Sequence, residues 1–67
     1  MSKKYTVKIR SNYEEDKREV LITEATPMLA HKRALLKSVK QFEEIHTILN
    51  ENGRVVYDIK NGFNYGE

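Results

Sequence analysis

The sequence predicts an α+β domain with the element order β-β-α-β-β, in which one helix packs across one face of a small four-stranded, mainly antiparallel sheet. Three observations predict this fold. Residues 5–10 alternate between apolar and polar side chains, which is typical of a strand with one buried face. Thr26 and Pro27 precede apolar residues with helical spacing. Asn52 and Gly53 separate two further apolar runs, as the turn of a β-hairpin does.

The first two strands are expected to form a hairpin. In residues 5–10, Tyr5, Val7 and Ile9 would face the core, and the polar residues between them would face solvent. Residues 11–17 are polar and are predicted to form a loop. Residues 18–24 contain the run Val20-Leu21-Ile22-Thr23, whose β-branched residues favour a second strand.

The helix is predicted to begin at Pro27 with Thr26 as its N-cap, because threonine caps helices well and proline is tolerated at the first helical position. It would end near residues 41–43, since the carboxylates that follow are unfavourable beside a helix C-terminus. Residues 42–49 could instead continue the helix, but a strand fits their apolar pattern better. The core-facing stripe of the helix would contain Met28, Leu35, Val39 and Phe42, with Leu29 and Leu36 beside it.

Two registers compete for the second hairpin. A two-residue turn at Asn52-Gly53 would pair Thr47 with Asp58. A three-residue loop, with Gly53 in the left-handed conformation, would pair Asn50 with Arg54. The second register also matches apolar residues and opposite charges across the strands, with the pairs Ile48–Val56, His46–Asp58 and Glu44–Lys60. Because matched pairs stabilise a sheet, we expect the three-residue loop.

The sheet face that the helix leaves open is expected to carry an apolar patch with a polar rim. In the chosen register, Ile48 and Val56 lie on the face away from the helix, and Leu21 joins them from the second strand. Such patches often mark interaction sites. The predicted interface residues are therefore Leu21, Ile48, Val56 and His46. The predicted core contains Val7, Ile9, Leu35, Val39, Tyr57 and Ile59.

The chain of 67 residues allows a single domain, which is predicted to span residues 1–62 and to be followed by a short tail of residues 63–67. Phe63 or Tyr65 of this tail could dock on the open face or on a partner. There is no cysteine, so disulfides cannot support the small core. Chains of this size are commonly stabilised by oligomerisation, so we expect a homodimer or a protein partner.

Charge is unevenly distributed, although the net charge is only +2. Residues 1–40 carry ten Lys or Arg and five Asp or Glu, whereas residues 41–67 carry two and five, so the two parts are about +5 and −3. On the helix, Arg33, Lys37 and Lys40 would form a basic stripe that could contact nucleic-acid phosphates. Lys8 and Arg10 lie on the opposite side of the predicted fold, so nucleic acid is the less favoured partner.

No catalytic site is predicted. His46 opposite Asp58 resembles a base with an orienting carboxylate, but no serine or cysteine lies nearby as a nucleophile. The three glycines are isolated and form no phosphate-binding loop. The consecutive acids Glu14, Glu15 and Asp16 lack the spacing of a calcium loop. We therefore expect no enzyme activity, no cofactor, no metal ion and no small-molecule substrate.

The sequence is most consistent with a small non-enzymatic interaction protein, which self-associates or binds and modulates another protein through its open sheet face. The alternative is a small nucleic-acid-binding accessory protein that uses the basic helix. No apolar run is long enough to cross a membrane and no apolar signal segment is present, so we expect a cytoplasmic location and no membrane partner. The Lys-, Glu- and Asn-rich composition indicates an accessory protein of a phage or mobile element.

Overall fold

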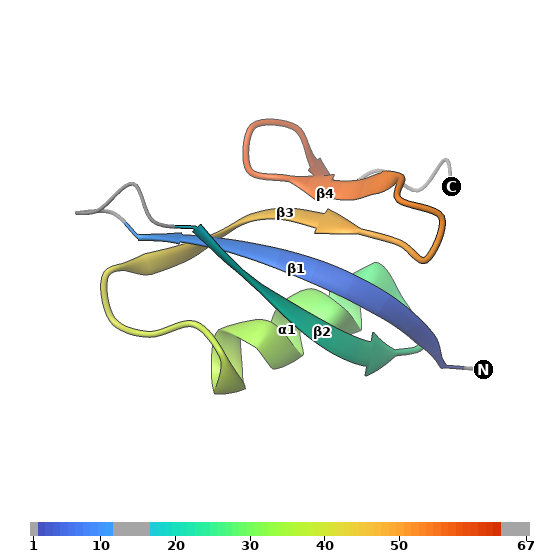
Figure 1. Ribbon diagram of the computed structural model, residues 1–67, viewed down its shortest axis with the longest axis horizontal. Coiled ribbons are helices and arrows are strands. Elements are labelled where there is room, and N and C mark those ends of the chain that lie inside the picture. Colours follow the sequence, from blue (N-terminus) through green and yellow to red (C-terminus); the bar gives the residue numbers. More distant parts are fainter. Residues whose placement is uncertain (1, 12–16, 64–67) are drawn as a thin grey trace.

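One helix packs against one face of an antiparallel sheet (Figure 1). The computed structural model describes residues 2–11 and 17–63. The elements are β1 (Lys3–Ser11), β2 (Lys17–Glu24), α1 (Pro27–Lys37), β3 (Glu43–Leu49), β4 (Val55–Asp58) and β5 (Gly62–Phe63). The strand order is β2-β1-β3-β4-β5, and all neighbouring strands are antiparallel. The predicted α+β class is confirmed, but the strand count was wrong, because Gly62 and Phe63 add a short fifth strand to β4.

The core lies between the helix and the sheet. Tyr5, Val7 and Ile9 of β1 are buried, as their alternation predicted. Val7 lies opposite Val20 of β2 and Ile48 of β3, so these three neighbouring strands contribute to one apolar layer. The buried apolar side chains are Tyr5, Val7, Ile9, Ile22, Ala30, Ala34, Ile45, Ile48 and Val56. The helix lies under β1 and β2, while β4 lies toward the other edge of the sheet (Figure 1).

The helix starts as predicted, but it buries a different face. The Thr26 hydroxyl accepts a hydrogen bond from the Leu29 N–H (3.2 Å), and Pro27 occupies the first turn. The residues that face the sheet are Pro27, Ala30 and Ala34, three small side chains at helical spacing. Most of the predicted core-facing stripe is therefore exposed, namely Met28, Leu29, Leu35, Leu36 and Phe42. Small residues occupy the sheet-facing side of the helix because the large side chains of the sheet already fill the layer beneath it.

The helix also ends earlier than its apolar pattern indicates. Its last residue is Lys37, and the N–H groups of Ser38 and Val39 both donate to the Ala34 carbonyl (2.8 Å each). Val39 still packs against the core from the segment that follows the helix. Phe42 lies in the next turn with a φ of 70° and is exposed. The predicted stripe thus included two residues, Val39 and Phe42, that are not helical.

The β3–β4 hairpin combines the two registers that the sequence allows. The Asn50 N–H donates to the Arg54 carbonyl (2.9 Å), and Gly53 has a φ of 81°, so the predicted three-residue loop is confirmed. Beyond Leu49, which lies opposite Val55, a bulge shifts the register by one residue. Thr47 then lies opposite Asp58, as in the two-residue alternative. The predicted pairs Ile48–Val56 and His46–Asp58 were therefore wrong, and Glu44 instead pairs with Arg10 across β1 and β3.

A second irregularity lies between β1 and β3. Lys8 lies opposite Thr47, but the next residue, Ile9, lies opposite Ile45, so β3 holds one extra residue at this point. Ile45 and Ile48 are both buried despite their odd spacing, because the extra residue resets the alternation. Together, the two bulges turn Ile48 and Val56 toward the core.

Candidate interaction surface

The predicted patch on the open sheet face does not form as the sequence indicated. Ile48 and Val56 are both 0% exposed and belong to the same buried cluster as Ala30 and Ala34 of the helix. Leu21 is 76% exposed, as expected. His46 is half-buried, and its Nδ1 lies 2.7 Å from the Thr47 hydroxyl instead of facing Asp58. Of the four predicted interface residues, only Leu21 offers an exposed apolar surface.

The open face instead carries a single, mostly apolar row with two charged rows on one side of it. The strand register aligns Leu21, Thr6, Leu49 and Val55 across four strands. The adjacent row contains Glu19 and Lys8, whose charged groups lie 3.9 Å apart, followed by Thr47 and Asp58. The row beyond it contains Arg10, whose Nε donates to Glu44 Oε1 at 3.0 Å. The open face is therefore mostly polar and internally paired.

A larger apolar surface lies on the outer side of α1. Met28, Leu29, Leu35 and Leu36 are each about half exposed or more, and Leu36 is 75% exposed. They are exposed because the helix uses its smallest residues against the sheet. Exposed groups of large apolar side chains of this kind are uncommon on proteins without partners and often mark binding surfaces.

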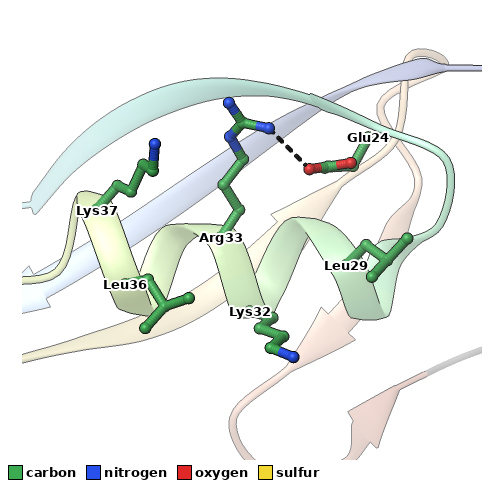
Figure 2. A pocket seen from close by; sticks show the side chains of 6 residues that line it. All are labelled: Glu24, Leu29, Lys32, Arg33, Leu36 and Lys37. Atoms are coloured by element: carbon green, nitrogen blue, oxygen red, sulfur yellow. Dashed lines mark hydrogen bonds and ion pairs between the residues drawn. The ribbon is translucent and has the colours of Figure 1, made fainter.

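Charged side chains border this surface and form a shallow pocket with it (Figure 2). The pocket has a volume of about 250 Å³ and is lined by Glu24, Leu29, Lys32, Arg33, Leu36 and Lys37. Leu29 and Leu36 lie seven residues apart, two turns along the helix, and Lys32 lies between them. Arg33 and Lys37 lie on the side nearer β2, where Arg33 Nη1 contacts Glu24 Oε2 at 2.9 Å. We call these six residues the outer helix face.

The basic stripe predicted from Arg33, Lys37 and Lys40 is broken in the structure. Glu24 pairs with Arg33 and offsets its charge. Lys40 lies in the turn after the helix, where its backbone N–H donates to Glu43 Oε1 (2.8 Å). Lys37 is the last helical residue. Lys32 completes the basic border of the outer helix face. The sequence signal that could have placed it there is the helical spacing of Pro27, Ala30 and Ala34, which marks the buried side of the helix.

An aromatic cluster joins the helix to the last two strands. The ring of His31 lies 4.7 Å from that of Tyr57 and 5.3 Å from that of Phe63, and the latter two are 4.8 Å apart. Burial lowers the pKa of His31 below its usual 6.5, because the charged ring would lose hydration there. Phe63 thus packs beside the helix. One of the two expectations for the tail, that Phe63 docks on the open sheet face, was therefore wrong.

Two features singled out in the sequence lie outside the described residues, namely the acidic run Glu14-Glu15-Asp16 and Tyr65. Within residues 2–11 and 17–63, no three His, Asp or Glu side chains gather closely enough to hold a metal ion. In that same part of the chain, α1 is too short and too polar to cross a membrane.

No family model, curated protein or solved structure matches the chain.

Proposed function

We propose that the chain is a small non-enzymatic interaction protein that binds an acidic, amphipathic segment of another protein through its outer helix face. The observation that carries the proposal is the exposure of Leu29 and Leu36 next to Lys32 and Lys37. α1 contains no acidic residue, so a partner that covers these leucines must also accommodate positive charge. An amphipathic helix with apolar residues on one side and carboxylates beside them meets both requirements.

Apolar contact supports a protein partner over nucleic acid. Phosphate binding requires several free cations on one surface, whereas Arg33 is engaged by Glu24 and Lys40 lies beyond the helix. Leu29 and Leu36 would add nothing to a phosphate contact, but they are suitable anchors for an apolar partner surface. The open sheet face is the weaker protein-binding candidate, because its apolar row is one residue wide and charged rows border it.

Site-specific photocrosslinking in the organism that encodes the chain would test this function. Benzoylphenylalanine would replace Leu36 on the outer helix face, and Lys60, exposed in the turn between β4 and β5, would serve as the matched control position. We expect a protein adduct from position 36 and not from position 60, with an excess of Asp and Glu in the crosslinked segment.

Three outcomes would contradict the proposal. The first is the absence of a protein adduct from position 36. The second is an adduct that forms equally from Lys60, since it would reflect random encounter. The third is an adduct with nucleic acid, which would favour the basic-helix alternative.

A further inference from the structure

β2 is a long edge strand with an apolar centre. It is the terminal strand of the sheet, and within the described residues it pairs only with β1. Its eight residues exceed the usual strand length of about five or six. The outer side of an edge strand presents unpaired backbone N–H and C=O groups, which can pair with a strand of another chain.

Of the devices that usually protect an edge strand, β2 has charged residues only toward its two ends, and it has neither a proline nor a bulge. It contains no proline, and its register with β1 runs without a bulge from Lys3–Glu24 to Arg10–Lys17. Its charged residues lie in its first three positions and its last, so Val20, Leu21 and Ile22 form an uncharged centre. Leu21 in this centre is 76% exposed. Such an edge is open to strand pairing.

A second copy of the chain fits this edge in one antiparallel register, centred on Leu21. There Leu21 lies opposite Leu21 of the second copy, and Val20 lies opposite Ile22. In the same register Arg18 lies opposite Glu24 of the second copy, so opposite charges meet at both ends. Centring on Val20 would oppose Arg18 to Ile22, and centring on Ile22 would oppose Val20 to Glu24. Parallel pairing of equivalent residues would place Arg18 beside Arg18, which is destabilising.

The charges at the two ends also continue interactions that each copy already makes. Arg18 binds Glu43 within its own copy, and Glu24 binds Arg33. In the Leu21-centred register these two pairs would meet and form a row of alternating sign. The row would run from Glu43 to Arg18 and on to Glu24 and Arg33 of the second copy. Networks of several charges contribute more than isolated surface pairs do.

We infer that two copies of the chain associate through β2 in this Leu21-centred register, joining two five-stranded sheets into one continuous sheet. The pairing uses the backbone of β2 and the side chains of its centre. It shares Glu24 and Arg33 with the border of the outer helix face but does not use Leu29 or Leu36, so it does not rest on the function proposed for that face.

The absence of cysteine allows a direct test by disulfide crosslinking. Opposed Cα atoms in an antiparallel pair are about 4.5–5.5 Å apart, which a disulfide can span. Thr23→Cys is the matched control, because Thr23 is also exposed on β2 but would lie opposite Glu19 of the second copy. Its own symmetry mate would be offset by roughly 14 Å along the strand, at about 3.4 Å per residue, which no disulfide can span.

Each single-cysteine variant is incubated with oxidised glutathione, which accepts the two electrons and two protons released when two thiols form a disulfide. We expect Leu21→Cys to form a covalent dimer at least roughly tenfold faster than Thr23→Cys, because only the former places its sulfurs within reach. Equal rates at the two positions would indicate random collision and would overturn the register.

Sedimentation equilibrium of the unmodified chain gives a second, independent readout. We expect a mass of twice 7.9 kDa at high micromolar concentration. Leu21→Lys should restore the single-chain mass while circular dichroism shows a folded protein, because position 21 is exposed within one copy. Val55→Lys is the matched control, since Val55 is exposed on the same face but lies on β4. A single-chain mass for the unmodified protein, or dissociation by Val55→Lys as well, would overturn the inference.

Discussion

Arg18 of β2 clamps Glu43 at the start of β3, although one whole helix separates them in the sequence. Arg18 Nη2 donates to Glu43 Oε1 at 2.8 Å, and Arg18 Nε donates to Glu43 Oε2 at 3.1 Å. The same Nη2 also donates to the Ser38 carbonyl just after α1. A planar guanidinium can make these bonds simultaneously, so one side chain joins β2, the end of the helix and β3.

Loss of this clamp should destabilise the fold. In Arg18→Met the apolar stem remains, but Glu43 loses its bidentate partner and the Ser38 carbonyl loses a donor. We expect a lower midpoint of thermal unfolding, and we expect Arg18→Lys to recover little of it, because one ammonium group cannot reproduce the planar pattern of donors. A midpoint for Arg18→Lys equal to that of the unmodified chain would show that charge alone matters here.

The same clamp should make the protein sensitive to acid. Hydrogen bonds from Arg18, and then from the Lys40 N–H, lower the pKa of Glu43 from 4.5 to about 2. Because the folded-state pKa is the lower one, this stabilisation is fully present above pH 4.5 and is lost as the pH falls toward 2. Glu43→Gln should flatten the pH dependence of the free energy of unfolding in this range. An unchanged slope in denaturant titrations would refute the assignment.

His31 should affect stability in a separate, higher pH range. Its pKa is lowered by burial, so the unfolded chain binds a proton more readily than the folded one. The contribution of the neutral ring is fully present above pH 6.5 and declines as the pH falls below this value. In His31→Gln, the free energy of unfolding should vary less between about pH 7 and about pH 5 than in the unmodified chain. A variant with the same pH dependence would show that His31 is not its source.

The burial pattern predicts opposite responses to two similar substitutions. Ile48→Ala should cost about 2–5 kcal/mol, because it leaves a cavity in the core. Leu36→Ala should change stability by less than about 0.5 kcal/mol, because that side chain is mostly exposed and alanine favours helices. Urea unfolding of both variants would check the contrast. Comparable losses would mean that the helix buries its leucines, as the apolar pattern alone indicated.

Gly53 should be difficult to replace. It has a φ of 81° in the loop between β3 and β4, where Asn50 Oδ1 accepts hydrogen bonds from the N–H groups of Asn52 and Arg54 (2.9 Å each). Gly53→Ala should cost roughly 1–2 kcal/mol, since a Cβ is strained in this conformation. Gly53→Asn should cost less, because asparagine tolerates left-handed φ values better. Equal losses in thermal unfolding would argue against a left-handed loop.

Local signals in the sequence were sufficient for the start of the helix, the first four strands and the loop chemistry. Thr26-Pro27 marked the start of the helix, and Asn52-Gly53 marked the loop with its left-handed glycine. These predictions succeeded because capping and left-handed turns depend on a few neighbouring residues. The alternation of Tyr5, Val7 and Ile9 also predicted the buried face of β1 correctly, because the alternation of side chains along β1 is not interrupted between these residues.

The faces of β3, β4 and the helix depend on the tertiary structure. A bulge shifts the alternation by one residue, so Ile48 and Val56 turn inward while Leu49 and Val55 turn outward. No residue type at His46 or Val56 marks a bulge. On the helix, hydrophobicity favoured the leucines for the core, whereas the closest packing selected Ala30 and Ala34. For these two reasons the sequence placed the exposed apolar residues on the wrong face. Of the predicted interface residues Leu21 is exposed, while Arg33 and Lys37, predicted as the alternative contact with nucleic acid, line the outer helix face.

The most direct test of this account measures which side chains the folded molecule exposes. Because the chain has no cysteine, single-cysteine variants Leu36→Cys and Val56→Cys can be alkylated with iodoacetamide at the same pH. We expect the thiol at position 36 to react as in the unfolded chain. The thiol at position 56 should react orders of magnitude more slowly, because it requires opening of the core. Rapid alkylation at position 56 together with protection at position 36 would contradict the account and restore the sheet face as the exposed apolar surface.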